Sequence, residues 1–269
     1  MVDILRRSLA PVTDAAWTEI DAQASQVIRG SLSGRAVVDF SGPHGWELGA
    51  VNLGRVRIPE KHTAGGVQWG LREVLPLVET RVPFTLSLME LDSVARGAKD
   101  PDLDAVCNAG EKAALFEEKA IYDGFKQAAI EGILSSSPHT PLQLTKKAED
   151  YPVVVERAMV AIEKKGIGGP YDLVLGTVPF EILMAGDQRG YPIKMRIADL
   201  IRGEIRWSPA LKGGVVISKR GGDYELTVGQ DFSVGYHGHD GEKVHLYITE
   251  SFVFRVLEPR AALPLIVRA

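Results

Sequence analysis

Hydrophobic and polar residues alternate most regularly in the last quarter of the chain. Val244, Leu246 and Ile248 alternate with His245, Tyr247 and Thr249, and Phe252 and Phe254 continue the alternation after Glu250. A half-buried β-strand has this period of two. The preceding residues, 237–243, are polar and contain two glycines, which is typical of a hairpin connection. We therefore expect a long antiparallel element at the centre of a sheet.

A helical period predicts a first helix after a short amphipathic segment, residues 1–12. Thr13 is expected to cap this helix, which ends near Gly30. Its apolar face consists of Trp17, Ile20, Ala24, Val27 and Ile28. The periodicity favours burial of this face in the subunit's own core, and the alternative is that part of it stays open as a docking groove.

A second, longer helix is predicted from a cap at Asp102 to about Ile130. Its apolar stripe consists of Leu103, Val106, Cys107, Gly110, Ala114, Ile121, Phe125 and Ala128. The charged residues Glu111, Glu117, Glu118 and Lys119 are expected to face water. The polar run 135–138 then breaks the chain, and we place a domain boundary there.

Residues 41–91 have the pattern of an extended β arm with a polar tip at 59–66. Alternating residues up to Leu88 predict its return strand. A two-stranded arm cannot bury both of its faces within one subunit, so the arm indicates a partner surface. The alternative is a long hairpin folded back on its own sheet.

Residues 150–220 alternate between predicted helices and strands. The first helix is capped by Asp150, has Pro152 in its first turn and ends at Gly166. Strands are expected at 172–175 and 214–218, and the apolar tail at 263–267 is expected to pair with this region. Two short helices are expected between the strands, one capped by Thr177 and running through Met184, the other at 193–201.

Composition narrows the class of protein. The chain has 269 residues, of which 45% are hydrophobic and 25% charged, and its net charge is −4. The net charge argues against nucleic acid as the main partner. One cysteine allows no disulfide within the chain, and no signal peptide or membrane-spanning run is found in this sequence.

Candidate catalytic and metal-binding motifs are few. His237 and His239 share one face of a strand and are candidate zinc ligands, but their glycine-rich surroundings favour a solvated hairpin tip. The glycines at 166–169 lie between a helix and a strand, which is the wrong order for a phosphate loop. Cys107 lies on an apolar helix stripe, and no nucleophile motif is present. The residues do not indicate an enzyme.

Six strings together resemble the encapsulin shell proteins, also known as linocin-like bacteriocins. The longest is Gly-Gly-Asp-Tyr-x-Leu-x-x-Gly-Gln-Asp-x-Ser-x-Gly-Tyr at residues 221–236. The others, in order, are Ala10-Pro11-Val12-Thr13 with Trp17 and Glu19-Ile20-Asp21; Gly42-Pro43-x-Gly45-Trp46-Glu47; Trp69-Gly70-Leu71-Arg72 with Leu75-Pro76-Leu77; Phe84-Thr85-Leu86 with Glu90-Leu91-Asp92; and Gly169-Pro170-Tyr171. The resemblance covers nearly the whole chain without a large gap.

The resemblance implies an α/β (α+β) fold like that of tailed-phage major capsid proteins, with a peripheral domain, an apical domain and an extended β arm. The expected divisions, in order, are an N-terminal helical part at 1–40, the arm with its return strand at 41–91, a spine helix at 92–135, the apical domain at 136–220, the peripheral-domain sheet at 221–258 and a C-terminal strand returning to the apical domain at 259–269.

The implied function is structural. Subunits are expected to assemble into a closed icosahedral shell in the cytoplasm, in its smallest form, with no nucleic acid or membrane as partner. The shell would enclose a peroxidase or a ferritin-like iron oxidase that carries a C-terminal targeting peptide, which implies roles in oxidative stress or iron storage. A virus or prophage capsid protein is the alternative, and a protease or bacteriocin enzyme is a weaker one.

The resemblance also implies site residues. The loop Asp187, Gln188, Arg189, Gly190 and Tyr191 is expected to line the fivefold opening of the shell. Some relatives bind a flavin through an aromatic side chain where this chain has Met89, so no flavin or other cofactor is expected.

The resemblance also implies where the cargo peptide docks, which is between the N-terminal helix and the peripheral-domain sheet. The matching residues are Ile28, Leu32, Arg35, Asp39, Asp231, Phe232 and Val234. Apolar anchors of the peptide would pack on Ile28, Leu32 and Phe232, and Asp39 and Asp231 would attract a basic residue. The alternative is that these residues only join helix to sheet, with Arg35 paired to Asp39.

Overall fold

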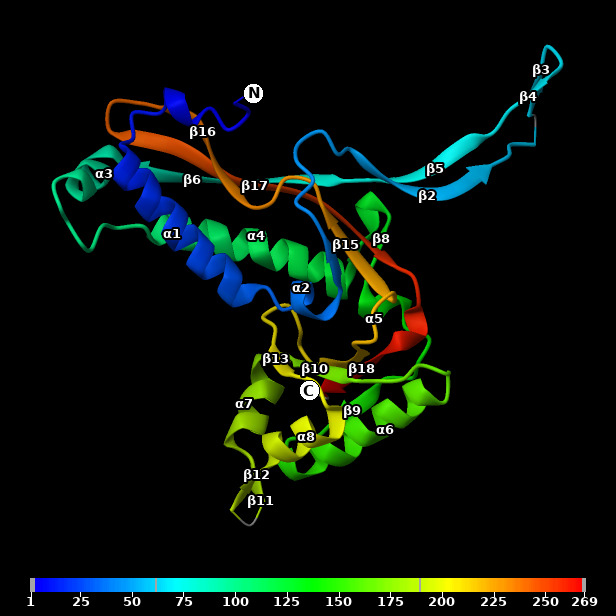
Figure 1. Cartoon of the computed structure of the whole chain (residues 1–269). Coiled ribbons are helices and arrows are strands. Elements are labelled where there is room, and N and C mark those ends of the chain that lie inside the picture. The colour runs from blue at the N-terminus through cyan, green and yellow to red at the C-terminus, as the bar shows by residue number, and fades with distance from the viewer. Residues whose placement is uncertain (1–2, 61, 189, 268–269) are drawn as a thin grey trace.

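A computed structural model describes residues 3–60, 62–188 and 190–267. The chain forms two lobes and one projecting arm (Figure 1). One lobe, the peripheral lobe, contains a five-stranded sheet with two long helices beneath it. The other, the apical lobe, contains a second five-stranded sheet flanked by three helices. This mixed architecture agrees with the fold class expected from the sequence.

The sheet of the peripheral lobe is organised around β17 (Lys243–Val256). Its order is β1 (Asp39–Ser41), β15 (Tyr224–Val228), β17 and β16 (Ser233–His239), and β6 (Val78–Ser87) also pairs with β17. The pairing of β17 with β6 is antiparallel and extends from Lys243 opposite Ser87 to Phe252 opposite Val78. The predicted central strand is therefore confirmed, and the turn before it is shorter than expected because β16 continues to His239.

The two long helices α1 (Asp14–Ser31) and α4 (Asp104–Tyr122) pack beneath this sheet. Thr13 caps α1 as expected, because its hydroxyl oxygen accepts a hydrogen bond from the backbone N–H of Ala16 at 3.3 Å. Trp17, Ile20, Ala24 and Ile28 of α1 are buried. Most of the predicted apolar face of α1 thus lies in the subunit's own core.

The predicted end of α4 is wrong. The helix ends at Tyr122 instead of reaching Ile130, because Gly124 takes a positive φ of 90° and leads into the hairpin β7 (Gly124–Phe125) and β8 (Ile130–Glu131). Phe125 and Ala128 therefore do not belong to the helix. At the other end Leu103 is the N-cap residue, and Asp102 accepts a hydrogen bond from the N–H of Asp104.

The sheet of the apical lobe has the order β13-β10-β14-β18-β9. Its strands are β13 (Ile205–Trp207), β10 (Tyr171–Leu175), β14 (Gly214–Ser218), β18 (Ala262–Val267) and β9 (Leu142–Leu144). The expected pairing of the C-terminal strand with this region is confirmed, since β18 pairs with β14. The helices around the sheet are α6 (Tyr151–Glu163), α7 (Thr177–Ala185) and α8 (Ile193–Ile201).

Of the two caps predicted in this lobe, Asp150 has the expected N-cap position without a capping bond, and Thr177 is wrong. Asp150 precedes α6 but makes no capping hydrogen bond, and its carboxylate accepts one from the Thr145 hydroxyl at 2.8 Å. Gly176, not Thr177, is the N-cap of α7. A Cβ at Gly176 would lie 2.0 Å from the carbonyl oxygen of Leu211, so no larger residue fits at that position.

The arm consists of β2 (Ala50–Arg57) and β5 (Leu71–Pro76), with the short strands β3 (Thr63–Ala64) and β4 (Val67–Gln68) at its tip (Figure 1). The predicted return strand does not belong to the arm. It is β6, which lies in the central sheet and is followed at Leu88 by α3 (Leu88–Ala95). The period of two in β6 comes from a sheet face that the subunit itself covers.

The remaining short elements connect these parts. They are 3₁₀ turns at Arg7–Leu9, Lys126–Ala128, Ala148–Asp150 and Pro259–Ala261, the helices α2 (Gly34–Val37) and α5 (Ile133–Ser136), and the strands β11 (Asp187–Gln188) and β12 (Tyr191–Pro192). Within the described ranges, no helix has both the length and the apolar composition needed to span a membrane.

Candidate functional site

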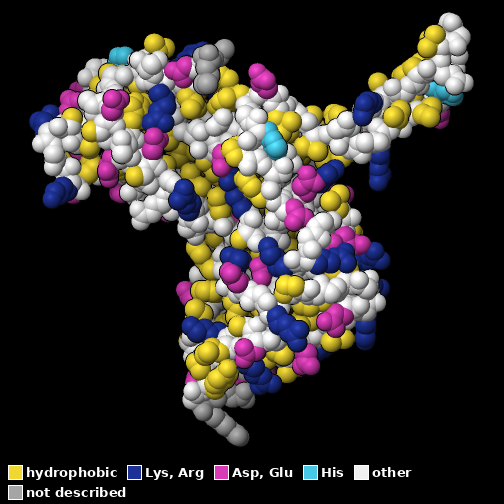
Figure 2. Space-filling model, viewed as in Figure 1, with side chains coloured by type: hydrophobic (Ala, Val, Ile, Leu, Met, Phe, Trp, Pro, Cys, Tyr) yellow, Lys and Arg dark blue, Asp and Glu magenta, His cyan; other side chains and the backbone are white. Residues whose placement is uncertain are grey.

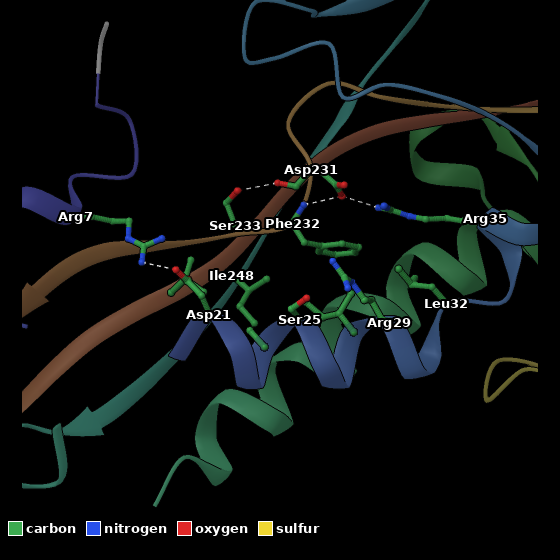
Figure 3. A pocket seen from close by; sticks show the side chains of 13 residues that line it. Arg7, Asp21, Ser25, Arg29, Leu32, Arg35, Asp231, Phe232, Ser233 and Ile248 are labelled. Atoms are coloured by element: carbon green, nitrogen blue, oxygen red, sulfur yellow. Dashed lines mark hydrogen bonds and ion pairs between the residues drawn. The ribbon is translucent and has the colours of Figure 1, made fainter. Parts of the chain in front are cut away.

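A cavity of about 380 Å³ opens between α1, α2 and the strands β16 and β17 (Figure 3). We call it the groove. Its lining consists of Arg7, Asp21, Ala24, Ser25, Ile28, Arg29, Leu32, Arg35, Asp231, Phe232, Ser233, Val234 and Ile248. Six of the seven residues expected to bind a peptide, all except Asp39, are therefore brought together in one place.

The floor of the groove is apolar. Ile28, Val234 and Ile248 are at most 5% exposed, whereas Leu32 and Phe232 are half-buried. The Phe232 ring extends over α1, toward Leu32 and Arg29 (Figure 3). An apolar floor with half-buried anchors at its edge can bind aliphatic side chains, each worth about 1.5–3 kcal/mol when fully buried.

Asp39 does not line the groove. It lies in β1, and its carboxylate accepts a hydrogen bond from the backbone N–H of Gly222 at 2.6 Å. The pairing of Arg35 with Asp39, which belonged to the alternative interpretation, is not found either, because Arg35 pairs with Glu117, Asp231 and Glu250. The spacing of four residues gives no contact here because α2 ends at Val37 and the chain turns into a strand.

One end of the groove is closed by the N-terminal segment. Arg7 pairs with Asp21 of α1 at 2.7 Å and lies 4.1 Å from the centre of the Trp17 ring. Sequence reasoning did not include Arg7, Asp21, Ser25 or Arg29. A sequence pattern that could have indicated the Arg7 contacts is present. Trp17 and Asp21 are four residues apart on one helix face, and the basic pair Arg6-Arg7 precedes them.

The other end of the groove is closed by Arg35. The Arg35 Nε lies 2.9 Å from Glu117 Oε1, and Nη2 lies 2.6 Å from Glu250 Oε1 and 2.9 Å from Asp231 Oδ1. Burial alone would lower the pKa of Arg35, but hydrogen bonding and Coulomb attraction to Glu117 raise it above its ordinary value. The guanidinium also faces the rings of Phe40 and Phe232 at 5.1 and 5.0 Å.

Glu117 and Glu118 are fully buried, which corrects the expectation that they face water. Glu118 accepts hydrogen bonds from the hydroxyls of Ser33 and Ser208, at 2.6 and 2.7 Å, and from the N–H of Gly34 at 2.6 Å. Burial raises the pKa of Glu118, and these hydrogen bonds oppose the shift. Both adjacent positions are buried because each carboxylate has partners from the region of α2: Glu117 pairs with Arg35, and Glu118 bonds Ser33 and Gly34.

The loop expected at a fivefold opening forms the hairpin of β11 and β12 at the far tip of the apical lobe (Figure 1). Asp187 accepts a hydrogen bond from the N–H of Gly190 at 2.8 Å, and Gly190 has a positive φ of 81°. Tyr191 is 48% exposed. Gln188 belongs to β11, and Arg189 lies outside the described residues.

The candidate metal and cofactor residues are dispersed. His237 lies where the register of β16 shifts, between Tyr236 and Gly238, and His239 hydrogen-bonds the Tyr236 hydroxyl. In the part of the chain that the structure describes, no group of three potential ligands is close enough to hold a metal ion. Met89 is 67% exposed on α3. Gly166 has a positive φ of 78° just after α6, as a helix-ending glycine does.

Three comparisons place this geometry among known proteins. The family Linocin_M18, described as "Encapsulating protein for peroxidase", matches residues 2–253. The chain is 44% identical over 267 residues to the type 1 encapsulin shell protein of Rhodospirillum rubrum, covering 97% of this chain and 95% of that protein. It is 40% identical over 261 residues to the shell protein of the same name from Mycobacterium tuberculosis, covering 97% and 98% of the two chains.

Solved structures share the fold at low sequence identity. The virus-like particle of Pyrococcus furiosus matches with a TM-score of 0.67 and 16% identity, over 94% of this chain and 99% of that one. The Mycobacterium phage Bobi structure matches with a TM-score of 0.60 and 14% identity, over 89% and 91%. The expected capsid-like fold is confirmed. The expectation that the chain is not an enzyme is confirmed by the curated relatives, which are structural shell proteins.

Proposed function

This chain belongs to the Linocin_M18 family of encapsulating proteins, and from that premise we propose that many copies of it assemble into a closed shell that takes up a cargo protein. The smallest icosahedral form, with about 60 copies, is the form we expect. We place the shell in the cytoplasm. Its cargo would be a peroxidase, as the family description suggests, or a ferritin-like iron oxidase.

The observation that carries this proposal is the outer part of the arm, whose described apolar side chains remain exposed in the single subunit. Val56, Val67, Leu71 and Val74 are 48–66% exposed, and Ile58 is 67% exposed. Figure 2 shows hydrophobic side chains along the projecting arm. A two-stranded hairpin is only marginally stable in water, and exposed apolar groups on it favour contact with another molecule. A second copy of the chain supplies such a surface repeatedly, as a closed assembly requires.

The groove supports the second half of the proposal. It combines an apolar floor, half-buried anchors and charged ends, which suits a short extended peptide from a cargo protein. The viral alternative is disfavoured, because the likeness to phage capsids is one of fold, whereas the likeness to shell proteins extends to the sequence. We propose no bound flavin, because the thioether of Met89 cannot stack on a ring as an aromatic side chain does.

The test is deletion of Val56 to Gly70, which removes the outer part of the arm but spares Val51 and Leu75, packed against the core. The intact chain should sediment as a particle of megadalton scale, and the deleted chain as small species with unchanged circular dichroism. Analytical ultracentrifugation and negative-stain electron microscopy measure this. An intact chain that stays a stable monomer from about pH 6 to about pH 8 would contradict the proposal.

A further inference from the structure

Three carboxylates converge on a single nitrogen atom at the inner end of the groove. The Arg35 Nη2 lies 2.7 Å from Glu117 Oε2, 2.6 Å from Glu250 Oε1 and 2.9 Å from Asp231 Oδ1. A guanidinium NH2 group has two hydrogens, so it cannot donate fully to three acceptors. One positive charge therefore faces three groups that are each negative in water near neutral pH.

Two of the three carboxylates are removed from water. The side chains of Glu117 and Glu250 are 0% and 1% exposed, whereas that of Asp231 is 38% exposed. Glu250 Oε2 is buried and has no hydrogen-bond partner among the described residues. Burial, and then the neighbouring Glu117, raise the pKa of Glu250 well above its usual range. Two adjacent buried carboxylates rarely both ionise, and a bound proton removes the conflict.

Within the described residues, Arg35 is the cation that forms ion pairs with Glu117 and Glu250, and Arg29 of the adjoining α1 also lines the groove. Arg35 comes from α2, Glu117 from α4, and Asp231 from the loop between β15 and β16. The neighbouring strand β6 faces Glu250 with Thr80, whose hydroxyl donates to the Glu250 carbonyl oxygen. The charged residues beside it, Glu79 and Arg81, pair with each other at the surface, 51% and 52% exposed.

We propose that Glu250 keeps a proton at neutral pH and that this proton leaves Arg35 free to hold Asp231, so that the charge of the groove wall responds to pH. When the proton passes to water, the buried pair carries two negative charges and draws Arg35 inward. Asp231 then presents an uncompensated carboxylate to the groove, which attracts a cationic residue of the occupant. That this wall belongs to a docking groove rests on the proposed function, but the proton and its effect on Asp231 do not.

The sign of the stability effect follows from proton binding. The unfolded chain releases the Glu250 proton in the ordinary carboxyl range, whereas the folded chain keeps it to higher pH. Between those two values the folded state binds more protons, so the free energy of unfolding falls as pH rises through the folded pKa. Below the ordinary value this contribution of Glu250 is fully present.

The first experiment compares the assembled wild-type protein with Glu250→Gln, and with Glu79→Gln as the exposed control on β6. Thermal midpoints are measured from about pH 5 to about pH 9.5, at one concentration and scan rate. The wild type and the control should lose stability toward high pH, and Glu250→Gln should lose distinctly less. Infrared spectra near neutral pH should show a protonated carboxyl band that is absent from Glu250→Gln. Parallel pH profiles, or no such band in the wild type, would overturn the proposed proton on Glu250.

The second experiment tests whether loss of the Glu250 proton weakens the ion pair between Arg35 and Asp231. Asp231→Asn is introduced into the wild type and into Glu250→Gln, and its cost in thermal midpoint is measured at both ends of the pH range. In the wild type the cost should be larger at low pH, where Arg35 holds Asp231, than at high pH. In Glu250→Gln the cost should not change with pH. The same cost at both pH values in both backgrounds would overturn the link. Failure of peptide docking would leave these results unchanged, which separates the inference from the proposed function.

Discussion

Glu118 is one of the residues that link the two lobes. Its carboxylate accepts hydrogen bonds from Ser33 and Gly34, at the start of α2, and from Ser208, which follows β13 of the apical sheet. Ser33 also exchanges a hydrogen bond with the buried hydroxyl of Tyr122. A buried carboxylate with several donors is costly to remove, because each donor then loses its partner in a place that water does not reach.

We therefore expect Glu118→Ala to destabilise the protein by about 2–4 kcal/mol, because it leaves three donors without an acceptor. Glu118→Gln keeps one acceptor oxygen and should cost less. Glu111→Ala on the exposed face of the same helix is the control and should be nearly neutral. Thermal midpoints of the assembled proteins, at one concentration and scan rate, measure the difference. Equal effects of Glu118→Ala and Glu111→Ala would contradict this account.

Phe232 gives a prediction about docking, with Phe40 as its matched control. Both rings face Arg35 at nearly the same distance, 5.0 and 5.1 Å, but only Phe232 lines the groove. Phe232→Ala should therefore give intact shells that purify empty when the native cargo is coexpressed, and Phe40→Ala should leave the packaging ratio unchanged. The ratio of cargo to shell protein on a denaturing gel measures this. Packaging by Phe232→Ala at the original ratio would place the docking site elsewhere.

Single residues show where sequence reasoning succeeds. The sequence predicts Thr13 as a cap because its hydroxyl bonds a backbone N–H only three residues further along the chain. Ile28, Leu32 and Phe232 were placed in one groove only through the family resemblance, since no period links residues so far apart in sequence. Glu118 was expected in water because a charged residue is most often exposed, and its donors come from segments that only the fold brings near.

At the scale of elements, a local sequence pattern predicts that a strand forms but not which strand it pairs with. The alternation in β6 correctly predicts a strand, but alternation does not say which strand is its neighbour, and β6 pairs with β17 instead of extending the arm. The strand at 214–218 is predicted with its observed bounds. All five residues of β14 are buried, and a short apolar run is typical of a strand that is buried on both faces. The predicted end of α4 is wrong because Phe125 and Ala128 continue the helical spacing past Gly124, whose positive φ ends the helix.

Replacing two glycines with alanine, one within α1 and one just after α4, should change the stability of the protein in opposite directions. Gly30 lies within α1, and a Cβ there would meet nothing within 4 Å, so Gly30→Ala should stabilise the protein by about 0.5–1 kcal/mol. At Gly124 φ is +90°, and a Cβ would lie 2.7 Å from the backbone nitrogen of Gly132. Gly124→Ala should therefore destabilise by more than about 1 kcal/mol. Thermal midpoints compare the two variants, and a shift of the same sign in both would refute the assignment.

At the scale of the whole molecule, exposed apolar groups lie on the apical lobe as well as on the arm. Val178 and Met184 of α7, Met195 of α8 and Tyr191 of the β11–β12 hairpin are 48–57% exposed. The hairpin's strands have two residues each and project from the tip of the lobe (Figure 1). So short a hairpin gains little stability from its own pairing, and exposed apolar side chains on the same lobe favour contact with a neighbouring subunit. The apical lobes are therefore expected to meet in the assembly.

We predict that in the assembled shell the β11–β12 hairpin lies nearest the fivefold axis and lines its opening, with Asp187 contributing to the local charge. Convergence of five apical tips would give Tyr191 and Met184 the neighbours that one subunit does not provide. Tyr191→Ser should then lower the thermal midpoint of the assembled shell, whereas the same change should have little effect on the arm-deleted, unassembled subunit. A cryo-electron microscopy map measures the position of the hairpin directly. A map that places the hairpin away from the axis, or an equal loss of stability in shell and subunit, would refute the prediction.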